Sequence, residues 1–289
     1  MIDLDIISYP IGQNGLDKNL NSINFGSYEG RLKIGGIKLI LDGSPQGKTA
    51  YLTEPYYKPP HNESDSYKGY PLIPQSEVSR WVKKYADLNV PIMAHANGDA
   101  AADMLIKAVK DADITSDHRT IMIHAQTVRE DQLDQMNELK IIPSYFSTHT
   151  FYWGDWHRDS VFGKDRAMRI SPTKSTLNRN MPFTVHNDAP VVPPDMIRLL
   201  WSTTNRKTRS GKVLGEEQKI STYSALEAMT INAAYQHFED DIKGTIEVGK
   251  QADLVVLSED PLSIDPENLL KIRVIATYSK GIEIFDAQQ

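Results

Sequence analysis

The sequence contains no cysteine in its 289 residues. Disulfides, thiolate metal ligands and a cysteine nucleophile are therefore excluded. A bound metal would have to be held by histidine, by carboxylates or by a modified lysine. The sequence also has no apolar run near the roughly 18 residues needed to span a bilayer, and residues 1–5 lack the basic and apolar regions of a signal peptide. These absences predict no membrane partner and favour the cytoplasm, although they leave the compartment open.

Basic residues are fewer than acidic ones: the sequence has 32 Lys and Arg residues and 38 Asp and Glu residues, and the net charge is −6. This balance argues against nucleic acid as a partner. Hydrophobic residues make up 40% and charged residues 24%, which are values typical of a globular chain. The length allows one large domain or two ordinary ones.

Short apolar runs alternate with helix-like segments through most of the chain, which predicts an α/β fold with a parallel sheet. We expect strands at residues 4–9, 34–41, 90–94, 120–123, 141–146 and 183–186. We expect helices at 76–88 with a Ser cap, 99–110 with Asp99 as the cap, 127–139 with a Thr127–Glu130 capping box, 195–204 and 221–237.

These six strands are two short of a closed TIM barrel, which has eight. Residues 1–240 are therefore predicted to form part of a TIM-type (β/α) barrel. Residues 44–74, rich in proline and aromatic residues, are predicted to form a long loop over one face. Residues 241–289 are predicted to form a small β-sandwich portion, with a short strand and a turn at 243–250 and strands at 252–257, 274–278 and 282–285.

Four histidines stand at or just after the ends of predicted strands, and they are His95, His124, His149 and His186. In TIM barrels the carboxyl ends of the strands carry the active site. A single histidine in such a place is most often a buried residue bound by a backbone carbonyl, but several of them favour a metal site. Asp188 shares strand parity with His186, so both side chains can point toward the barrel axis.

Lys38 interrupts an apolar strand, and a buried lysine is costly unless it is paired or chemically modified. Two interpretations are equally supported by its spacing. Lys38 either faces outward or pairs with Asp42, or it is a metal-site lysine whose amine is carboxylated. The remaining histidines, at positions 61, 118, 157 and 237, are predicted to be surface or structural residues.

Five motifs together resemble those of amidohydrolase family 3, which includes N-substituted formamide deformylases and YtcJ-like proteins. They are Ile-Lys-Leu-Ile-Leu-Asp-Gly-Ser at 37–44, Ala-His-Ala-Asn-Gly-Asp at 94–99, Ile-His-Ala-Gln at 123–126, His-Asn-Asp-Ala-Pro-Val at 186–191, and the segment 244–257. The match covers nearly the whole chain in the family's order.

The resemblance implies a metal-dependent hydrolase that acts on carbon–nitrogen bonds other than peptide bonds, by way of metal-activated water. It implies zinc as the divalent metal, with one or two ions, and an amide-type small molecule as the substrate. Metal ligands implied by the family are His95, His124, Asp188 and Lys38, with or without carboxylation; Asp188 is also the catalytic base; and His149, His186, Asp42 and Trp153 contact substrate.

One family motif is missing, because no His-x-His occurs in the sequence. In the family this motif ends the first barrel strand and supplies two metal ligands. The chain is therefore expected to correspond to the C-terminal part of a family member. It is either half of an enzyme that needs a partner, such as an N-terminal half or another copy in a homo-oligomer, or a non-catalytic remnant. Aromatic residues in segments 44–74 and 147–156 suit an apolar substrate group and loop packing equally well.

Overall fold

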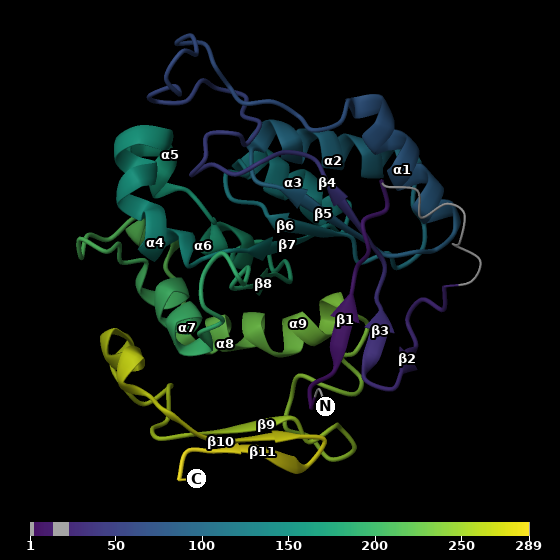
Figure 1. Ribbon diagram of the computed structural model, residues 1–289, viewed down its shortest axis with the longest axis vertical. Coiled ribbons are helices and arrows are strands. Elements are labelled where there is room, and N and C mark those ends of the chain that lie inside the picture. Colours follow the sequence, from purple (N-terminus) through teal and green to yellow (C-terminus); the bar gives the residue numbers. More distant parts are fainter. Residues whose placement is uncertain (1–2, 14–22, 289) are drawn as a thin grey trace.

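The computed structural model describes residues 3–13 and 23–288, and its centre is a parallel sheet of five strands in the order β4-β5-β6-β7-β8 (Figure 1). All four neighbouring pairs are parallel. The strands are β4 (Ile37–Ile40), β5 (Ile92–Ala96), β6 (Ile121–His124), β7 (Ile142–Tyr145) and β8 (Thr184–Val185). Sequential parallel strands joined by helices confirm the predicted α/β class.

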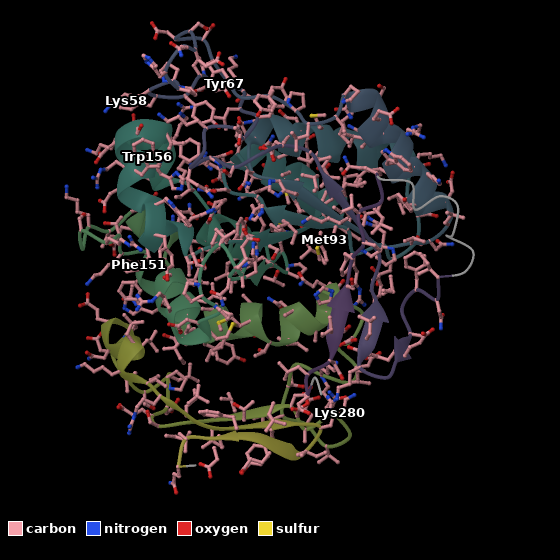
Figure 2. The ribbon with its side chains drawn as sticks, in the orientation of Figure 1. Lys58, Tyr67, Met93, Phe151, Trp156 and Lys280 are labelled. Atoms are coloured by element: carbon pink, nitrogen blue, oxygen red, sulfur yellow. The ribbon has the colours of Figure 1, made fainter. Side chains whose placement is uncertain are left out.

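Burial along the strands shows which face of the sheet is covered. In β4 and β5 the buried residues alternate with partly exposed ones, as in Ile37, Lys38 and Leu39. The buried set packs with α1 (Gln75–Asp87) and α2 (Asp99–Ala112) in one hydrophobic core. The other set, which includes Met93 and His95, lies on the opposite face of the sheet and keeps some solvent exposure. Figure 2 shows Met93 on this face.

The first two predicted strands are corrected by the structure. The segment predicted at 4–9 contains β1 (Ile6–Ser8), which pairs with β3 (Leu32–Ile34) and β2 (Tyr28–Glu29) in a separate three-stranded sheet. The segment predicted at 34–41 breaks at Gly35 and Gly36, where an added Cβ would collide with Tyr9 and with the carbonyl of Pro91. A single parallel bridge from Ile11 to Lys38 extends the barrel sheet beyond β4.

Helix boundaries show four further differences from the sequence predictions. Helix α1 is preceded by Pro74 rather than a Ser cap, and Asp99 lies inside α2 while its carboxylate accepts the Thr53 N–H. Helix α3 (Glu130–Glu138) begins after Arg129, whose N–H donates to Gln132, while the Thr127 hydroxyl donates to Asn97. The predicted helix 221–237 breaks at Thr230 into α8 (Thr222–Met229) and α9 (Ile231–Gln236).

Other helices lie on the later half of the barrel. Helix α7 (Met196–Asn205) follows its predicted bounds closely and is capped by Asp195, which accepts the Arg198 N–H. The aromatic-rich segment 147–156 is largely α4 (His149–Trp156), followed by a π-helix at His157–Val161. Two short helices follow, α5 (Lys164–Met168) and α6 (Thr173–Leu177). No helix in the described part of the chain could cross a membrane.

The C-terminal portion is a three-stranded antiparallel sheet in the order β11-β10-β9. Its strands are β9 (Leu254–Leu257), β10 (Val274–Ser279) and β11 (Ile282–Asp286), and they match three of the four strands predicted there. The predicted strand at 243–250 is instead a run of turns. A short 3₁₀ helix (Pro266–Lys271) lies before β10 and contacts α7.

Charged side chains join the β1–β3 sheet to the C-terminal portion. Asp5 accepts ion pairs from Arg31, Lys243 and Lys280 at 2.8–3.3 Å. Lys33 and Glu239 form a buried ion pair at 3.0 Å, and Glu239 also pairs with Lys243. Ion pairs thus connect the first described residues of the chain with its C-terminal portion.

We expect acidic pH to weaken the ion pairs that join the β1–β3 sheet to the C-terminal portion; we call these contacts the junction. Burial alone would raise the pKa of Asp5, but hydrogen bonds from Lys280 and Lys243 outweigh it and hold the pKa at about 2. A carboxyl whose pKa is lower in the folded state stabilises the fold above its unfolded pKa and loses that contribution as the pH falls. The wild-type free energy of unfolding should therefore fall between about pH 4 and pH 2, by about 1–2 kcal/mol after solvent screening.

The measurement is urea unfolding of wild type and Asp5→Asn across this pH range. The Asn variant should be less stable at pH 6, and its stability should show less dependence on pH. Parallel curves for the two proteins would contradict the assignment to Asp5.

Candidate metal centre

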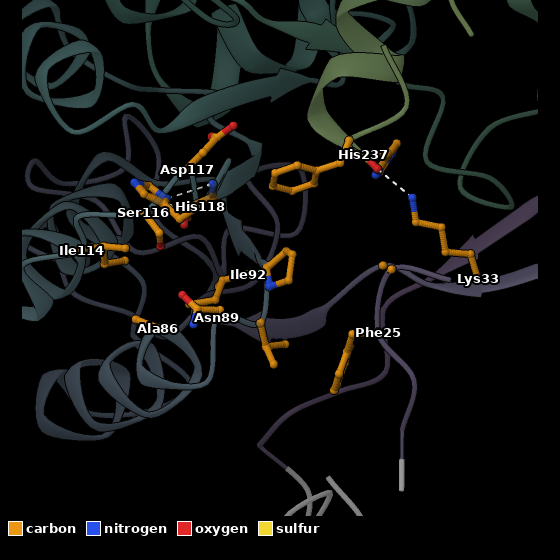
Figure 3. Close-up of a pocket in the computed structure, with 16 residues that line it drawn as sticks. Phe25, Lys33, Ala86, Asn89, Ile92, Ile114, Ser116, Asp117, His118 and His237 are labelled. Atoms are coloured by element: carbon orange, nitrogen blue, oxygen red, sulfur yellow. Dashed lines mark hydrogen bonds between the residues drawn. The ribbon is translucent and has the colours of Figure 1, made fainter. Parts of the chain in front are cut away.

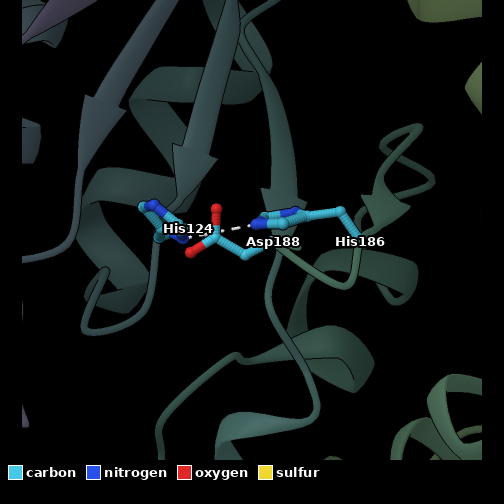
Figure 4. Close-up of side chains that lie close together, drawn as sticks. All are labelled: His124, His186 and Asp188. Atoms are coloured by element: carbon cyan, nitrogen blue, oxygen red, sulfur yellow. Dashed lines mark hydrogen bonds between the residues drawn. The ribbon is translucent and has the colours of Figure 1, made fainter. Parts of the chain in front are cut away.

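Three side chains with metal-ligand chemistry meet at the carboxyl ends of β6 and β8. One ligand atom from each of His124, His186 and Asp188 lies within 4.8 Å of the others (Figure 4). The imidazoles approach most closely between His186 Nε2 and His124 Nδ1, which are 3.3 Å apart. Two imidazoles and a carboxylate are a donor set that zinc and similar divalent ions accept.

The backbone at this cluster adopts a conformation that L-residues rarely occupy. His124, Ala125 and Asp188 have φ angles of 74°, 45° and 56°. His124 pairs with Ala96, so strand alternation alone would turn its side chain toward the helices. Its ring instead lies 4.5 Å from the ring of His95 and 5.1 Å from that of His186. Left-handed residues cost roughly 1–3 kcal/mol each and gather at functional sites.

His95 and Lys38 stand beside this cluster. His95 Nε2 lies 3.0 Å from the Gly43 carbonyl oxygen and 3.0 Å from Asn97 Nδ2, so this nitrogen is turned toward the β4 loop. Lys38 faces the barrel interior from β4, and the charge of Asp188 acts to raise the pKa of Lys38. The structure therefore groups His186, predicted to contact substrate, with His124 and Asp188, while His95 and Lys38 adjoin the group.

The environment keeps the imidazoles neutral. Burial lowers the pKa of His95 to about 4 and that of His186 to about 3. Burial, with the neighbouring histidines, also lowers the pKa of His124 well below its usual range. Neutral imidazole is the form that binds metal, so the ligands need not lose protons near neutral pH.

Lys38 and Asp188 have opposite charges, and burial moves their pKa values toward each other. Burial lowers the pKa of Lys38 to about 8, although the charge of Asp188 opposes this. Burial raises the pKa of Asp188, and Lys38 opposes that shift. The Asp188 carboxylate is thus a stronger base than a carboxylate in water.

Asp42 has a structural position behind the site. Its side chain is fully buried, and its oxygens accept the N–H groups of Tyr51, Asn97 and Gly98. Burial raises the pKa of Asp42 to about 7, and the three backbone hydrogen bonds oppose this shift. Both oxygens are committed to the backbone of loop 44–74 and the start of α2, and contact of Asp42 with substrate stays a prediction.

We expect Asp42→Asn to destabilise the fold by about 1–3 kcal/mol, since an amide nitrogen would face one backbone N–H and leave that buried donor without an acceptor. Chemical denaturation measures this effect. Asp113→Asn, at an exposed position on the αL residue that ends α2, is the matched control and should change stability by less than about 0.5 kcal/mol. Equal stabilities of wild type and Asp42→Asn would contradict the described hydrogen bonds.

An aromatic wall adjoins the metal-ligand cluster. His149 begins α4, is 1% exposed, and has its ring 4.2 Å from Phe146 and 5.6 Å from Trp153. Phe146 stacks on His186 at 5.6 Å and 22°. His149 and Trp153 are thus placed next to the cluster, and their contact with substrate stays a prediction.

His157 was predicted to be a surface or structural residue, and the structure places it in the protein interior at 0% exposure. Its ring lies 5.6 Å from that of His149, and its Nε2 lies 3.2 Å from Gln126 Nε2. The sequence carried a partial signal, because His157 is eight positions after His149. The fold brings the two rings together at the junction of α4 with the π-helix that begins at His157.

Loop 44–74 and the α4 segment lie together over the strand ends. Trp156 donates from Nε1 to the Gln46 carbonyl, and Lys48 lies over the Trp156 ring. Figure 2 shows Lys58 and Tyr67 near Trp156 on this side of the molecule. Segment 44–74 forms no helix or strand, as predicted for a long loop, and its residues Gln46 and Lys48 lie against Trp156 of α4.

A separate cavity of about 370 Å³ lies at the opposite, amino ends of the strands (Figure 3). Its lining includes Phe25, Ile92, His118 and His237. Both ring nitrogens of His118 and both of His237 already have hydrogen-bond partners. The reactive groups therefore gather at the carboxyl ends and not in this cavity.

Fold and site together define an α/β protein with a parallel sheet and a His-His-Asp cluster at the carboxyl ends of its strands. Residues 4–285 match the amidohydrolase family, and the chain belongs to that family.

Three relatives illustrate the match. The YtcJ protein of Bacillus subtilis (strain 168) is 25% identical over 261 residues, which is 88% of this chain and 48% of YtcJ. The N-substituted formamide deformylase of Arthrobacter pascens is 24% identical over 224 residues, 77% of this chain and 41% of the deformylase. The structure of an uncharacterized metal-dependent hydrolase from Pyrococcus furiosus is 28% identical, with a TM-score of 0.75 over 90% of this chain and 51% of that one. The chain thus spans about half the length of these relatives.

Proposed function

We propose that this chain supplies the C-terminal half of a metal-dependent hydrolase that cleaves carbon–nitrogen bonds of amide or formamide type. The observation that carries the proposal is the convergence of His124, His186 and Asp188 within 4.8 Å at the carboxyl ends of the barrel strands. The family match over residues 4–285 supports the hydrolase class. The Arthrobacter deformylase supports the choice of a formamide or related bond.

The residues present fit a divalent ion such as zinc. His124 and His186 are neutral because burial lowers their pKa values, and Asp188 adds one negative charge. Three protein ligands suit a catalytic zinc site, which keeps a position open. His95 could join them by exchanging its contact with the Gly43 carbonyl. A bound divalent ion would supply Lewis-acid polarisation of the substrate carbonyl and lower the pKa of a water molecule.

Lys38 also fits the proposed site in its carboxylated form. Carbon dioxide adds to a neutral amine, and burial lowers the pKa of Lys38 to about 8, so a useful neutral fraction exists near neutral pH. None of the described hydrogen bonds or ion pairs occupies its amine. The added carboxylate would face the same interior as Asp188.

The chain's own residues then divide the work. The Asp188 carboxylate, whose pKa is raised by burial, accepts a proton from the attacking water and returns it to the leaving nitrogen. His149 and the Phe146–Trp153 wall orient the acyl group beside that carboxylate. Loop 44–74 and α4 exclude water from the strand ends.

Hydrolysis of N-formyl and N-acyl amines by the purified chain with added zinc tests this proposal. The assay should be run with and without the N-terminal half of a family member that carries His-x-His. We expect slow or no turnover alone and zinc-dependent turnover with the added half, lost in Asp188→Asn. Absence of turnover in both arms, together with absence of zinc binding, would overturn the proposal.

A second candidate function, an interaction partner without its own activity, is favoured by the C-terminal sheet. Strands β9 and β11 expose apolar side chains that include Val255 at 53% and Ile282 at 63%. In β9 the neighbouring residues Leu254, Val255 and Val256 are all exposed, so both faces of the strand are open over these three residues. Exposed apolar strands of this kind mark an interaction surface or an aggregation hazard.

The partner we propose is a chain with the missing N-terminal half of the family, whose own sheet would cover β9 and β11. Co-expression of the two halves and size-exclusion chromatography test it. We expect a 1:1 complex that is weakened by Val255→Glu and by Ile282→Glu. A stable monomer that ignores the added half would contradict it, and self-association alone would point to a homo-oligomer.

A further inference from the structure

One buried charge lies outside the metal-ligand cluster and has no ion-pair partner among the described residues. It belongs to Arg206, which ends α7 and is 1% exposed. Burial lowers the pKa of Arg206 to about 10, so its guanidinium remains charged at neutral pH. A charge in the interior is costly unless hydrogen bonds compensate it, so the hydrogen bonds of this group show what it holds in place.

Three backbone carbonyls accept the hydrogen bonds of this guanidinium. Its Nε donates to Leu214 at 2.8 Å, its Nη1 to Ser171 at 3.0 Å and its Nη2 to Ile170 at 2.6 Å. The Leu214 N–H donates in turn to the Arg206 carbonyl at 2.9 Å, so backbone and side chain of Arg206 are both held by Leu214. Arg206 therefore joins the loop that follows α7 to residues 170 and 171.

Ser171 connects the guanidinium to the end of β6. Ser171 is fully buried and has a φ angle of 47°, in the left-handed region that an L-residue enters at a cost of about 1–2 kcal/mol. The Ile170 and Ser171 carbonyls belong to the peptide groups on either side of the Ser171 Cα, so Arg206 holds both in the orientation that this conformation requires. The Ser171 N–H then donates to the Gln126 carbonyl at 2.8 Å.

The Gln126 carbonyl lies directly after the turn that aims His124. In this turn His124 and Ala125 have φ angles of 74° and 45°. The Ala125 N–H donates to the Ala96 carbonyl at 3.0 Å, so backbone hydrogen bonds hold the turn both at its middle and at its end. From this turn the ring of His124 reaches a position 5.1 Å from the ring of His186.

We propose that Arg206 is a positioning residue for the His124 ring. It holds Ser171 in its left-handed conformation, the Ser171 N–H holds the Gln126 carbonyl, and that carbonyl fixes the turn from which His124 points toward His186. The use of His124 as a metal ligand rests on the proposed function, but the position of its ring does not. A role of Arg206 in stability alone would leave the ring in place in every variant that folds.

The position of the ring is measured in the full-length, metal-free chain. Nuclear Overhauser contacts between the ring protons of His124 and His186, assigned with single histidine substitutions, report it directly. Hydrogen exchange of the Ser171 amide reports the preceding link. We expect Arg206→Met to weaken the ring contacts and to speed exchange of the Ser171 amide by about tenfold, the effect on local opening of losing one hydrogen bond.

Zinc titration gives a second measurement. Groups that hold a metal ligand in place contribute about 10–100-fold to metal affinity, so Arg206→Met should weaken zinc binding by about 10-fold. Lys33→Met is the matched control, because it breaks a buried ion pair with Glu239 and is expected to lose at least as much stability. Lys33 lines the cavity at the amino ends of the strands, so its variant should leave zinc affinity and the His124 ring contacts unchanged.

Two further variants complete the test. Arg206→Lys keeps the charge and one donor nitrogen, so it covers failure of the Met variant to fold and should show the same changes in smaller size. Arg206→Met/Ser171→Gly should recover part of the ring contacts, since glycine adopts a φ of 47° without strain.

Unchanged ring contacts in the Arg206 variants that fold, or equal losses in Lys33→Met, would overturn the inference. A wild-type chain that binds no zinc would contradict the proposed function alone, because the ring contacts are measured without metal.

Discussion

Asp188→Asn is expected to lower the affinity of the chain for zinc by about 100-fold or more. Loss of a residue that merely supports a metal ligand costs 10–100-fold, so loss of a carboxylate ligand should lie at or beyond that limit. Asn is the matched substitution, because it tolerates the left-handed backbone at this position, where φ is 56°. An Ala variant would add backbone strain to the loss of the ligand.

Isothermal titration calorimetry with zinc measures the effect. Asp87→Asn is the control, since its carboxylate is exposed on α1 and pairs only with Lys83 among the described charges. His124→Ala and His186→Ala should weaken binding in the same assay, and His95→Ala should do so less if His95 is outside the ligand set. Equal affinities of wild type and Asp188→Asn would remove Asp188 from the metal site.

Lys33→Met should be the most destabilising of the single substitutions considered, at about 3–5 kcal/mol, the cost of removing one partner from a buried ion pair. The side chains of Lys33 and Glu239 are 5% and 4% exposed, and their charged atoms lie 3.0 Å apart. Lys33 also donates to the His237 carbonyl at 2.8 Å, which would lose this donor. Lys243 would remain as a partner of Glu239, so we expect the loss of stability to lie toward the lower end of this range.

Urea denaturation of the variants tests this expectation. Lys83→Met removes an exposed pair with Asp87 on α1 and should cost less than about 0.5 kcal/mol. The double variant Lys33→Met/Glu239→Leu should recover part of the loss, because no uncompensated acid is left buried. A cost below 1 kcal/mol for Lys33→Met would show that the junction opens to solvent.

The sequence predicted the parallel α/β class because apolar runs of strand length alternate with helical segments. It also predicted that His95, His124, His186 and Asp188 lie at one end of the sheet, because parallel strands bring their carboxyl ends to one edge. Both inferences depend on local pattern, and local pattern is what a single sequence carries. The family match came from the same strand-end segments.

Other features depended on contacts between distant residues. No local signal places β1 beside β3 instead of beside β4. The ion pairs of Asp5 with Lys243 and Lys280, more than 200 positions away, are also invisible in the sequence pattern. Similarly, the sequence gives no sign that Lys33 differs from an ordinary surface lysine. Only the fold places Glu239 beside it. The break between α8 and α9 at Thr230 was also not predicted from the sequence.

Within the site, the sequence by itself determined which chemical groups stand near the strand ends, since order and spacing place His124, His186 and Asp188 there. Only the tertiary structure decided which of them face one another. Strand alternation would have turned His124 toward the helices, and a left-handed backbone at His124 and Ala125 accompanies its approach to His186. Likewise, only the fold packs the buried ring of His157 against that of His149, at 5.6 Å.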